Sequence, residues 1–214
     1  MLEYRLLKNH AGILLCGDYL SLRDFHDAIH AANERSVLVK DKEGAFLGLA
    51  YDVRKAFEQQ REILEPPDHY LEIGPRFGVQ ILWPVLLVQS RIFRESLAFF
   101  DSSKIQQALA FNLESVIEAA LQEDFGVDSL ALVDLWQRID PKHPWPEEKL
   151  HSRGAQFCVW RKAERKKKLR GLLASFDPMY PFYYEHWAKA GDRDLVSPEA
   201  LDALHGAEWV DPHW

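Results

Sequence analysis

The sequence has few cysteines and no long run of hydrophobic residues. Only Cys16 and Cys158 occur among 214 residues, which is too few for a disulfide framework. The longest hydrophobic run, Ile81 to Val88, is far shorter than the roughly 20 residues of a membrane span. The segment that follows Met1 does not resemble a signal peptide. We therefore expect a soluble cytoplasmic protein that does not act in a membrane.

Motifs of several enzyme classes are missing as well. The chain contains no G-x-S-x-G, no P-loop and no G-x-G-x-x-G. Cys16 and Cys158 both have hydrophobic neighbours, which is typical of packed thiols rather than nucleophiles. The sequence thus indicates no catalytic residue and no cofactor, and it favours a non-enzymatic partner-binding or regulatory protein that binds another protein or associates with itself.

Charge is distributed unevenly along the chain. The formal net charge is -7, but the ten residues 161–170, RKAERKKKLR, contain seven basic side chains and one acidic. Subtracting this basic run from the totals leaves 19 basic and 32 acidic residues, a net charge of -13. Candidate contacts to a partner or to phosphate in the run are Arg161, Lys162, Arg165, Lys166, Lys167, Lys168 and Arg170.

The basic run has two alternative interpretations. Clustered Lys and Arg neutralise phosphates, so nucleic-acid binding is one of them. The other is that the run pairs with acidic residues of the same chain or of a second copy. We expect the second, because an acidic remainder repels nucleic acid at long range and offers abundant acidic surface within reach.

The first half of the chain mixes strand and helix patterns. The helix from Ser21 is predicted from a capping box with Asp24 and a hydrophobic staple between Leu20 and Phe25. Alternation of hydrophobic residues predicts strands over 2–7, 12–16, 36–40, 45–51 and 77–81. Start signals predict helices that begin at Ser21, Asp52, Pro84 and Ser103.

The second half predicts helices only. Beyond Gly126 the pattern indicates helices over 130–139, 147–176, 181–190 and 198–204, and five of the seven tryptophans follow residue 140. We predict an α+β fold in which a small, mostly antiparallel sheet and its helices form a core over 1–125. A helical, aromatic-rich extension over 126–214 then packs on this core in one continuous globular unit.

Three short motifs resemble a known family. They are Gly17-Asp18-Tyr19 after a strand, the segment GLAYDVR over 48–54 before a helix, and Leu82-Trp83-Pro84 at a strand–helix junction. Over roughly the first half of the chain they resemble a family of uncharacterised bacterial proteins, a domain of unknown function. The resemblance implies a bacterial cytoplasmic α+β domain and no particular chemistry.

Two histidines and two aspartates are candidate metal ligands. His26 and His30 lie four residues apart on a predicted helix, at a spacing that allows both to bind one metal ion. Asp18 and Asp52 each follow a predicted strand and precede a predicted helix, where two carboxylates can hold Mg²⁺. The structural alternatives are a polar helix edge for the histidines and helix capping for the aspartates.

These candidates define the alternatives to a partner-binding protein. If Asp18 and Asp52 share a metal ion, the chain is a metal-dependent enzyme that acts on phosphodiesters. If the basic run is exposed and unpaired, the chain binds nucleic acid. Since no third histidine ligand stands at a recognisable spacing, we expect no metal at His26 and His30.

Overall fold

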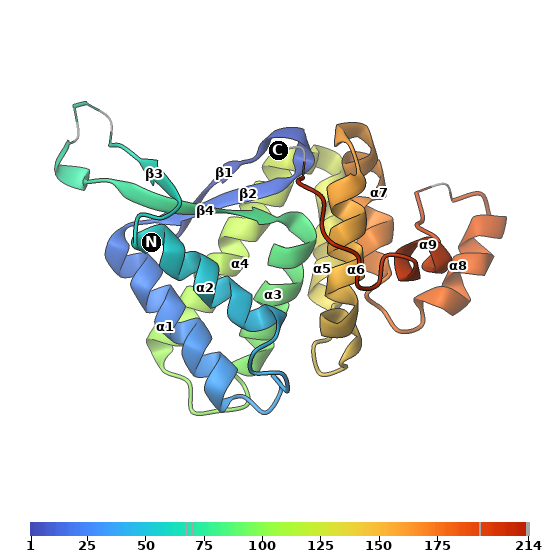
Figure 1. The fold of residues 1–214 in the computed structure, drawn as a ribbon, viewed down its shortest axis with the longest axis horizontal. Helices are drawn as coiled ribbons and strands as arrows, with labels where there is room; N and C mark the ends of the chain where they lie inside the picture. Colours follow the sequence, from blue (N-terminus) through green and yellow to red (C-terminus); the bar gives the residue numbers. More distant parts are fainter. Residues whose placement is uncertain (67, 70, 193, 213–214) are drawn as a thin grey trace. The chain divides into compact units, whose positions relative to one another are not determined.

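The computed structural model describes residues 1–66, 68–69, 71–192 and 194–212, which divide into two compact units (Figure 1). Unit 1 consists of Met1–Leu6, Ile13–Ile81 and Ile92–Ala120. Unit 2 consists of Leu7–Gly12, Leu82–Arg91 and Leu121–Trp214.

The strands all lie before residue 83, and helices dominate the remainder. The strands are β1 Glu3–Leu6, β2 Gly12–Gly17, β3 Glu62–Leu64 and β4 Arg76–Leu82. The 3-10 turns are η1 Lys8–His10, η2 Leu71–Ile73 and η3 Gly126–Asp128. The helices are α1 Tyr19–Arg35, α2 Ala45–Phe57, α3 Trp83–Ser96, α4 Lys104–Phe125, α5 Ser129–Arg138, α6 Trp145–Val159, α7 Lys162–Ala174, α8 Tyr180–Lys189 and α9 Pro198–Asp202.

Unit 1 is built on a four-stranded antiparallel sheet of order β1-β2-β4-β3. Its register pairs Glu3 with Cys16 at one edge and Glu62 with Gly78 at the other. Strand β2 is buried along its whole length, and α1 and α2 pack together on one face of the sheet (Figure 1). The predicted α+β fold, with its antiparallel sheet and helical second half, is therefore confirmed.

Residues 36–51 depart from the prediction. The predicted strands over 36–40 and 45–51 are wrong, because residues 36–40 form no strand and residues 45–57 form the single helix α2. Its buried residues Phe46, Leu49, Ala50 and Val53 follow helical spacing, so a period of 3.6 residues is the correct one. Asp52 consequently lies in the middle of α2 and does not begin a helix.

The start of α1 also differs from the prediction. Asp18, not Ser21, caps this helix, because its Oδ1 accepts a hydrogen bond of 2.8 Å from the Ser21 backbone N–H. Leu20 is 57% exposed and therefore forms no buried staple with Phe25. At α4 the predicted capping box is confirmed, since Ser103 N–H donates to Gln106 Oε1 at 2.8 Å and Gln106 N–H donates to Ser103 Oγ at 3.2 Å.

Unit 2 contains two helices where the sequence predicts one over 147–176. The break lies at Trp160, whose backbone is extended at φ -72° and ψ 142° and whose side chain is buried. Glu164 then begins α7 by accepting a hydrogen bond of 3.3 Å from the Arg161 backbone N–H. Because α7 starts as a separate helix, its direction is independent of α6.

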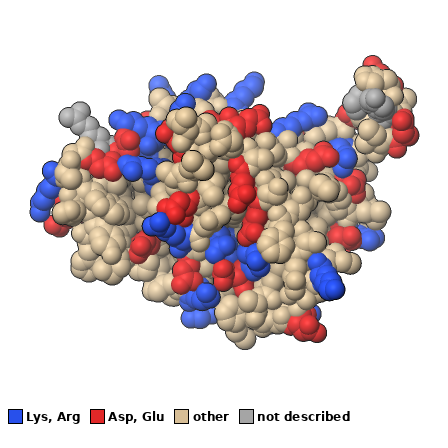
Figure 2. All heavy atoms as spheres, turned by 180° about the vertical axis from the view of Figure 1, so that it is seen from behind, with Lys and Arg blue, Asp and Glu red and all other residues tan. Residues whose placement is uncertain are grey.

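The surface carries charged side chains of both signs. Basic and acidic side chains are interspersed over the face that Figure 2 shows. None of the helices within the described ranges has the length and hydropathy that crossing a bilayer requires.

Candidate functional site

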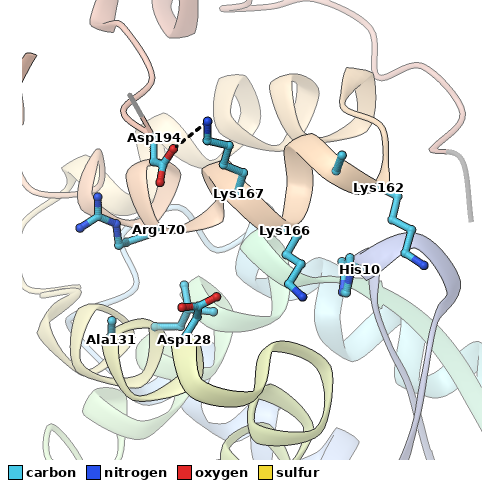
Figure 3. A pocket seen from close by; sticks show the side chains of 10 residues that line it. His10, Asp128, Ala131, Lys162, Lys166, Lys167, Arg170 and Asp194 are labelled. Carbon is cyan, nitrogen blue, oxygen red and sulfur yellow. Dashed lines mark ion pairs between the residues drawn. The ribbon is translucent and has the colours of Figure 1, made fainter. Parts of the chain in front are cut away.

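A cavity of about 760 Å³ lies beside helix α7 in unit 2 (Figure 3). Sites for small molecules usually enclose roughly 300–1,000 Å³, so this volume is sufficient for a metabolite. The lining combines η1, the junction of η3 and α5, helix α7 and the segment at Asp194. The lining residues are His10, Asp128, Ala131, Leu132, Lys162, Ala163, Lys166, Lys167, Arg170 and Asp194.

Helix α7 supplies the positive charge of the cavity. Lys162, Lys166 and Arg170 follow one another at intervals of four residues, so they lie along one face of the helix. Leu169 and Leu172 are buried, and Leu169 lies beside this row, one turn from Lys166. The helix therefore contributes these three cations and Lys167 to the cavity lining, while its hydrophobic residues hold it in unit 2.

Two cations of the lining already have acidic partners. Lys167 Nζ lies 3.3 Å from Asp194 Oδ1, and Arg170 Nη2 lies 2.6 Å from Asp192 Oδ2. Burial raises the pKa of Asp192, but the Asp194 backbone N–H and Arg170 outweigh it and lower the pKa below its ordinary value. These ion pairs hold Asp192 and Asp194 against α7.

Lys162 and Lys166 differ from these neighbours. In the described part of the chain neither ammonium group forms an ion pair. Figure 3 shows both side chains extending from α7 on the side where His10 lies, with Asp128 across from Lys166. The cavity thus presents two ammonium groups without an ion-pair partner, together with an imidazole and the carboxylate of Asp128.

The imidazole of His10 is held by a buried carboxylate. His10 Nδ1 lies 2.8 Å from Asp124 Oδ1, and Trp83 Nε1 donates a hydrogen bond of 2.9 Å to Asp124 Oδ2. The side chains of His10 and Asp124 are only 13% and 7% exposed, and Phe125 packs on the imidazole with ring centroids 5.4 Å apart. A carboxylate only accepts hydrogen bonds, so Nδ1 donates to Asp124, and in the neutral form of the ring Nε2 carries the lone pair.

The backbone that carries His10 has an uncommon conformation. Asn9 and His10 are consecutive non-glycine residues with φ of 59° and 52°. The loop is closed by hydrogen bonds from Leu7 N–H to the Gly12 carbonyl at 3.0 Å and from Ala11 N–H to the Lys8 carbonyl at 3.1 Å. Left-handed backbone at such residues costs free energy and recurs at functional sites, where it fixes the direction of a side chain.

A family model described as a domain of unknown function (DUF6904) matches residues 2–195. The chain belongs to this family. The match extends well beyond the first half of the chain, where the short motifs lie, and it includes every residue that lines the cavity. No curated protein and no solved structure matches the chain significantly.

In this DUF6904 chain the two candidate aspartates have unrelated surroundings. Asp18 caps α1 and lies 3.2 Å from Arg76 Nη1, whereas Asp52 lies within α2, 3.5 Å from Arg61 Nη2. Burial raises the pKa of Asp18, but hydrogen bonds from Ser21 and the N-terminal charge lower it to about 2. Burial raises the pKa of Asp52, and Arg61 opposes this only in part. Each carboxylate is thus satisfied by its own partners.

The candidate histidines lie together but form part of an aromatic cluster. Their ring centroids are 4.5 Å apart, His26 Nδ1 lies 2.9 Å from Asp27 Oδ1, and Phe57 packs edge-on against His26. Burial and the charge of His26 lower the pKa of His30. No group of three or more His, Cys, Asp or Glu side chains is placed to hold a metal ion in the described ranges.

The remaining residues of the basic run divide between interior and surface. Arg165 is fully buried, donates from Nε to the Phe157 carbonyl at 3.3 Å and lies over the Phe157 ring. Lys168 pairs with Glu164 at 3.3 Å, and Arg161 is exposed at the start of α7. Six of the seven basic side chains therefore reach the surface, three of them in ion pairs.

Sequence reasoning missed the residues that complete the DUF6904 cavity. Asn9, His10 and Gly12 predict only a hairpin turn, and nothing in the sequence relates His10 to Asp124, 114 positions away. A signal for the cavity face of α7 was present, since Lys162, Lys166 and Arg170 share one helical face.

Proposed function

We propose that this protein is a partner-binding protein whose partner is a small phosphate-bearing molecule held in the cavity beside α7. The supporting observation is that Lys162 and Lys166, which pair with no described carboxylate, lie beside His10 in the cavity lining. Ammonium groups form charge-assisted hydrogen bonds with phosphate oxygens. A phosphate group that enters the cavity would therefore supply the ion-pair partner that Lys162 and Lys166 lack among the described residues.

A small ligand fits the charges better than a nucleic acid does. Binding along a nucleic-acid backbone requires several unpaired cations spread over a surface. Here Lys167, Lys168 and Arg170 are already in ion pairs, and the remaining two cations of the lining face a concave site. The chain outside the basic run also has a net charge of -13, which repels polyanions at long range.

The carboxylate of Asp128 indicates a second group that the proposed ligand should carry. This exposed carboxylate belongs to the lining and lies across from Lys166 in Figure 3. A carboxylate accepts hydrogen bonds and repels phosphate. The proposed ligand therefore places its phosphate toward Lys162 and Lys166 and a hydroxyl or amino group toward Asp128, as a phosphorylated sugar or nucleoside can.

The proposed setting is a bacterial cytoplasm. The family resemblance in the first half of the chain implies a bacterial protein. Cys16 and Cys158 are buried free thiols, which a reducing compartment preserves, and burial raises the pKa of Cys158 to about 11.

Calorimetric titration with inorganic phosphate, pyrophosphate and a ribose phosphate tests this proposal. We expect saturable binding that weakens with salt, and an affinity at least about tenfold lower in the Lys162→Ala/Lys166→Ala double variant, since charge-assisted hydrogen bonds contribute roughly 1.5–3 kcal/mol each. Asp128→Asn is expected to weaken binding of the ribose phosphate more than that of inorganic phosphate.

The matched control is Lys189→Ala, which removes an exposed lysine of α8 in the same unit. This variant should bind as the wild type does. Absence of saturable binding, or equal binding by wild type and double variant, contradicts the proposal. A single-stranded oligonucleotide that binds more tightly than pyrophosphate would instead support the nucleic-acid alternative.

A further inference from the structure

The array formed by Trp83, Asp124 and His10 has features that phosphate binding alone does not require. A cation at position 10 would serve binding better than an imidazole with a free lone pair. Instead a nearly buried carboxylate, held by the indole N–H of Trp83, fixes the ring, and left-handed backbone at two successive residues directs it toward the cavity. Hydrogen-bonded carboxylate–imidazole pairs of this kind hold histidines that react with substrates.

We propose that the cavity is a phosphoryl-transfer site in which Nε2 of His10 is the nucleophile that attacks the phosphorus atom of the bound ligand. This inference rests on the proposed function, because it takes Lys162 and Lys166 as the groups that bind the phosphate beside the ring. The substrates are compounds with a good leaving group on phosphorus, such as acyl phosphates or phosphoramidates.

The proposed step balances for acetyl phosphate. The Nε2 lone pair forms a bond to phosphorus while the bond between phosphorus and the acyl oxygen breaks, and acetate departs with that electron pair. Water then attacks phosphorus, the P–N bond breaks, Nε2 regains its lone pair and the protons of the water remain on phosphate. The sum is acetyl phosphate and water giving acetate and dihydrogen phosphate.

Each neighbour of His10 has a defined part in this step. The ring becomes positively charged when Nε2 is phosphorylated, and the carboxylate of Asp124 at 2.8 Å stabilises that charge. Trp83 positions Asp124, and Lys162 and Lys166 stabilise the charge on the phosphoryl oxygens. Asp124 and Trp83 are therefore positioning residues, whereas His10 touches the reacting atom.

The experiment uses the full chain and a small phosphoryl donor. Protein is incubated with phosphoramidate or acetyl phosphate, and its intact mass and proteolytic peptides are analysed at neutral pH. We expect one added phosphoryl group on the peptide that contains His10, labile in acid and stable in base as a phosphohistidine is. His10→Asn should remain unmodified, and His186→Asn, which changes an exposed histidine of α8, should be modified as the wild type is.

Asp124→Asn separates positioning from folding. It should lower the rate of phosphorylation at least about tenfold while pyrophosphate still binds, because the neutral amide stabilises the phosphorylated ring less than a carboxylate does. If Asp124→Asn does not fold, Trp83→Phe removes the donor to Asp124 while keeping an aromatic ring in the core, and it should slow the reaction in the same direction.

The outcomes distinguish this inference from the proposed function. Wild-type protein that binds pyrophosphate but is not phosphorylated at His10 by either donor overturns the inference and leaves the binding function intact. Phosphorylation that persists in His10→Asn also overturns it. Absence of pyrophosphate binding contradicts the proposed function before any donor is added.

Discussion

The indole of Trp209 occupies the space that a side chain at position 154 would need. A Cβ atom built on Gly154 would lie 2.1 Å from Cζ2 of Trp209, so the indole contacts the backbone of α6 directly. Trp209 also packs near His151 and is 37% exposed. The absence of a side chain at Gly154 thus leaves room for the indole, which packs the segment after α9 against α6.

The variant Gly154→Ala should displace Trp209. Alanine in place of glycine inside a helix normally stabilises a protein by about 0.5–1 kcal/mol, but here the methyl group and the indole cannot occupy the same space. We expect faster proteolysis after residue 205. The control is Gly48→Ala in α2, where nothing lies within 4 Å of the added methyl group and stability should rise. An equal rise in stability in both variants would show that the position of the Trp209 indole does not require glycine at position 154.

The apolar side chains of α3 should dominate stability in both units. Leu86 and Phe93 are fully buried, and Phe93 packs edge-on against Phe25 with centroids 5.6 Å apart. Leu86→Ala or Phe93→Ala should each lower the free energy of unfolding by about 2–5 kcal/mol, measured by chemical denaturation. Ile105→Ala, at a site 66% exposed, should change it by less than about 0.5 kcal/mol. Losses below about 1 kcal/mol in both core variants would contradict the burial of this helix.

Asp18 should make stability depend on pH in the acid range. Its pKa of about 2 in the folded chain is below its ordinary value of 3.8, so the unfolded chain binds a proton first as pH falls. The free energy of unfolding should therefore decline from pH 3.8 to about 2, and the contribution of the carboxylate should be complete above pH 3.8. The variant Asp18→Asn lacks this carboxylate. The difference in free energy of unfolding between the variant and the wild type should therefore narrow as pH falls toward 2. If the free energy of unfolding depends on pH in the same way in both proteins, Asp18 does not have the lowered pKa.

Substitutions of Lys166 and Lys167, which are neighbours on α7, should affect different properties, namely ligand binding and stability. Lys166→Glu replaces an unpaired positive charge of the cavity with a negative one, so it should weaken pyrophosphate binding and leave stability nearly unchanged. Lys167→Glu replaces an ion pair at 3.3 Å with two like charges and should lower the free energy of unfolding by roughly 0.5–1 kcal/mol, since both groups are partly solvated. Denaturation and titration of both variants measure this. Equal loss of affinity without loss of stability would indicate that Lys167 also contacts the ligand.

Local signals in the sequence were sufficient where a single cue decides a structure. Ser103 with Gln106 predicts the start of α4, and Gly126, with φ of 58°, follows the last residue of that helix, a position that favours glycine. The sequence pattern gave the wrong structure where the hydrophobic residues fit both the two-residue period of a strand and the 3.6-residue period of a helix. Residues 45–51 contain hydrophobic side chains at both even and odd positions, and only packing against α1 selects the helix.

The candidate site required information that no local pattern contains. The sequence of β1 and β2 predicts a hairpin, but no local pattern indicates the left-handed backbone at Asn9 and His10 or the partnership of His10 with Asp124. Burial of Arg165 was equally hidden, because a cation within a basic run is usually solvated. Sequence reasoning therefore located the charge of the cavity but not its imidazole.

The arrangement of the cavity cations on one uninterrupted helix constrains how this stretch can vary among related chains. Each residue of an α-helix turns the chain by about 100°, so one inserted or deleted residue between Lys162 and Lys166 would rotate one of them out of the cavity. Exchanging lysine for arginine keeps both the charge and the direction of the side chain. Related chains that retain the site are therefore expected to keep the spacing of these positions while the identity of the cation varies.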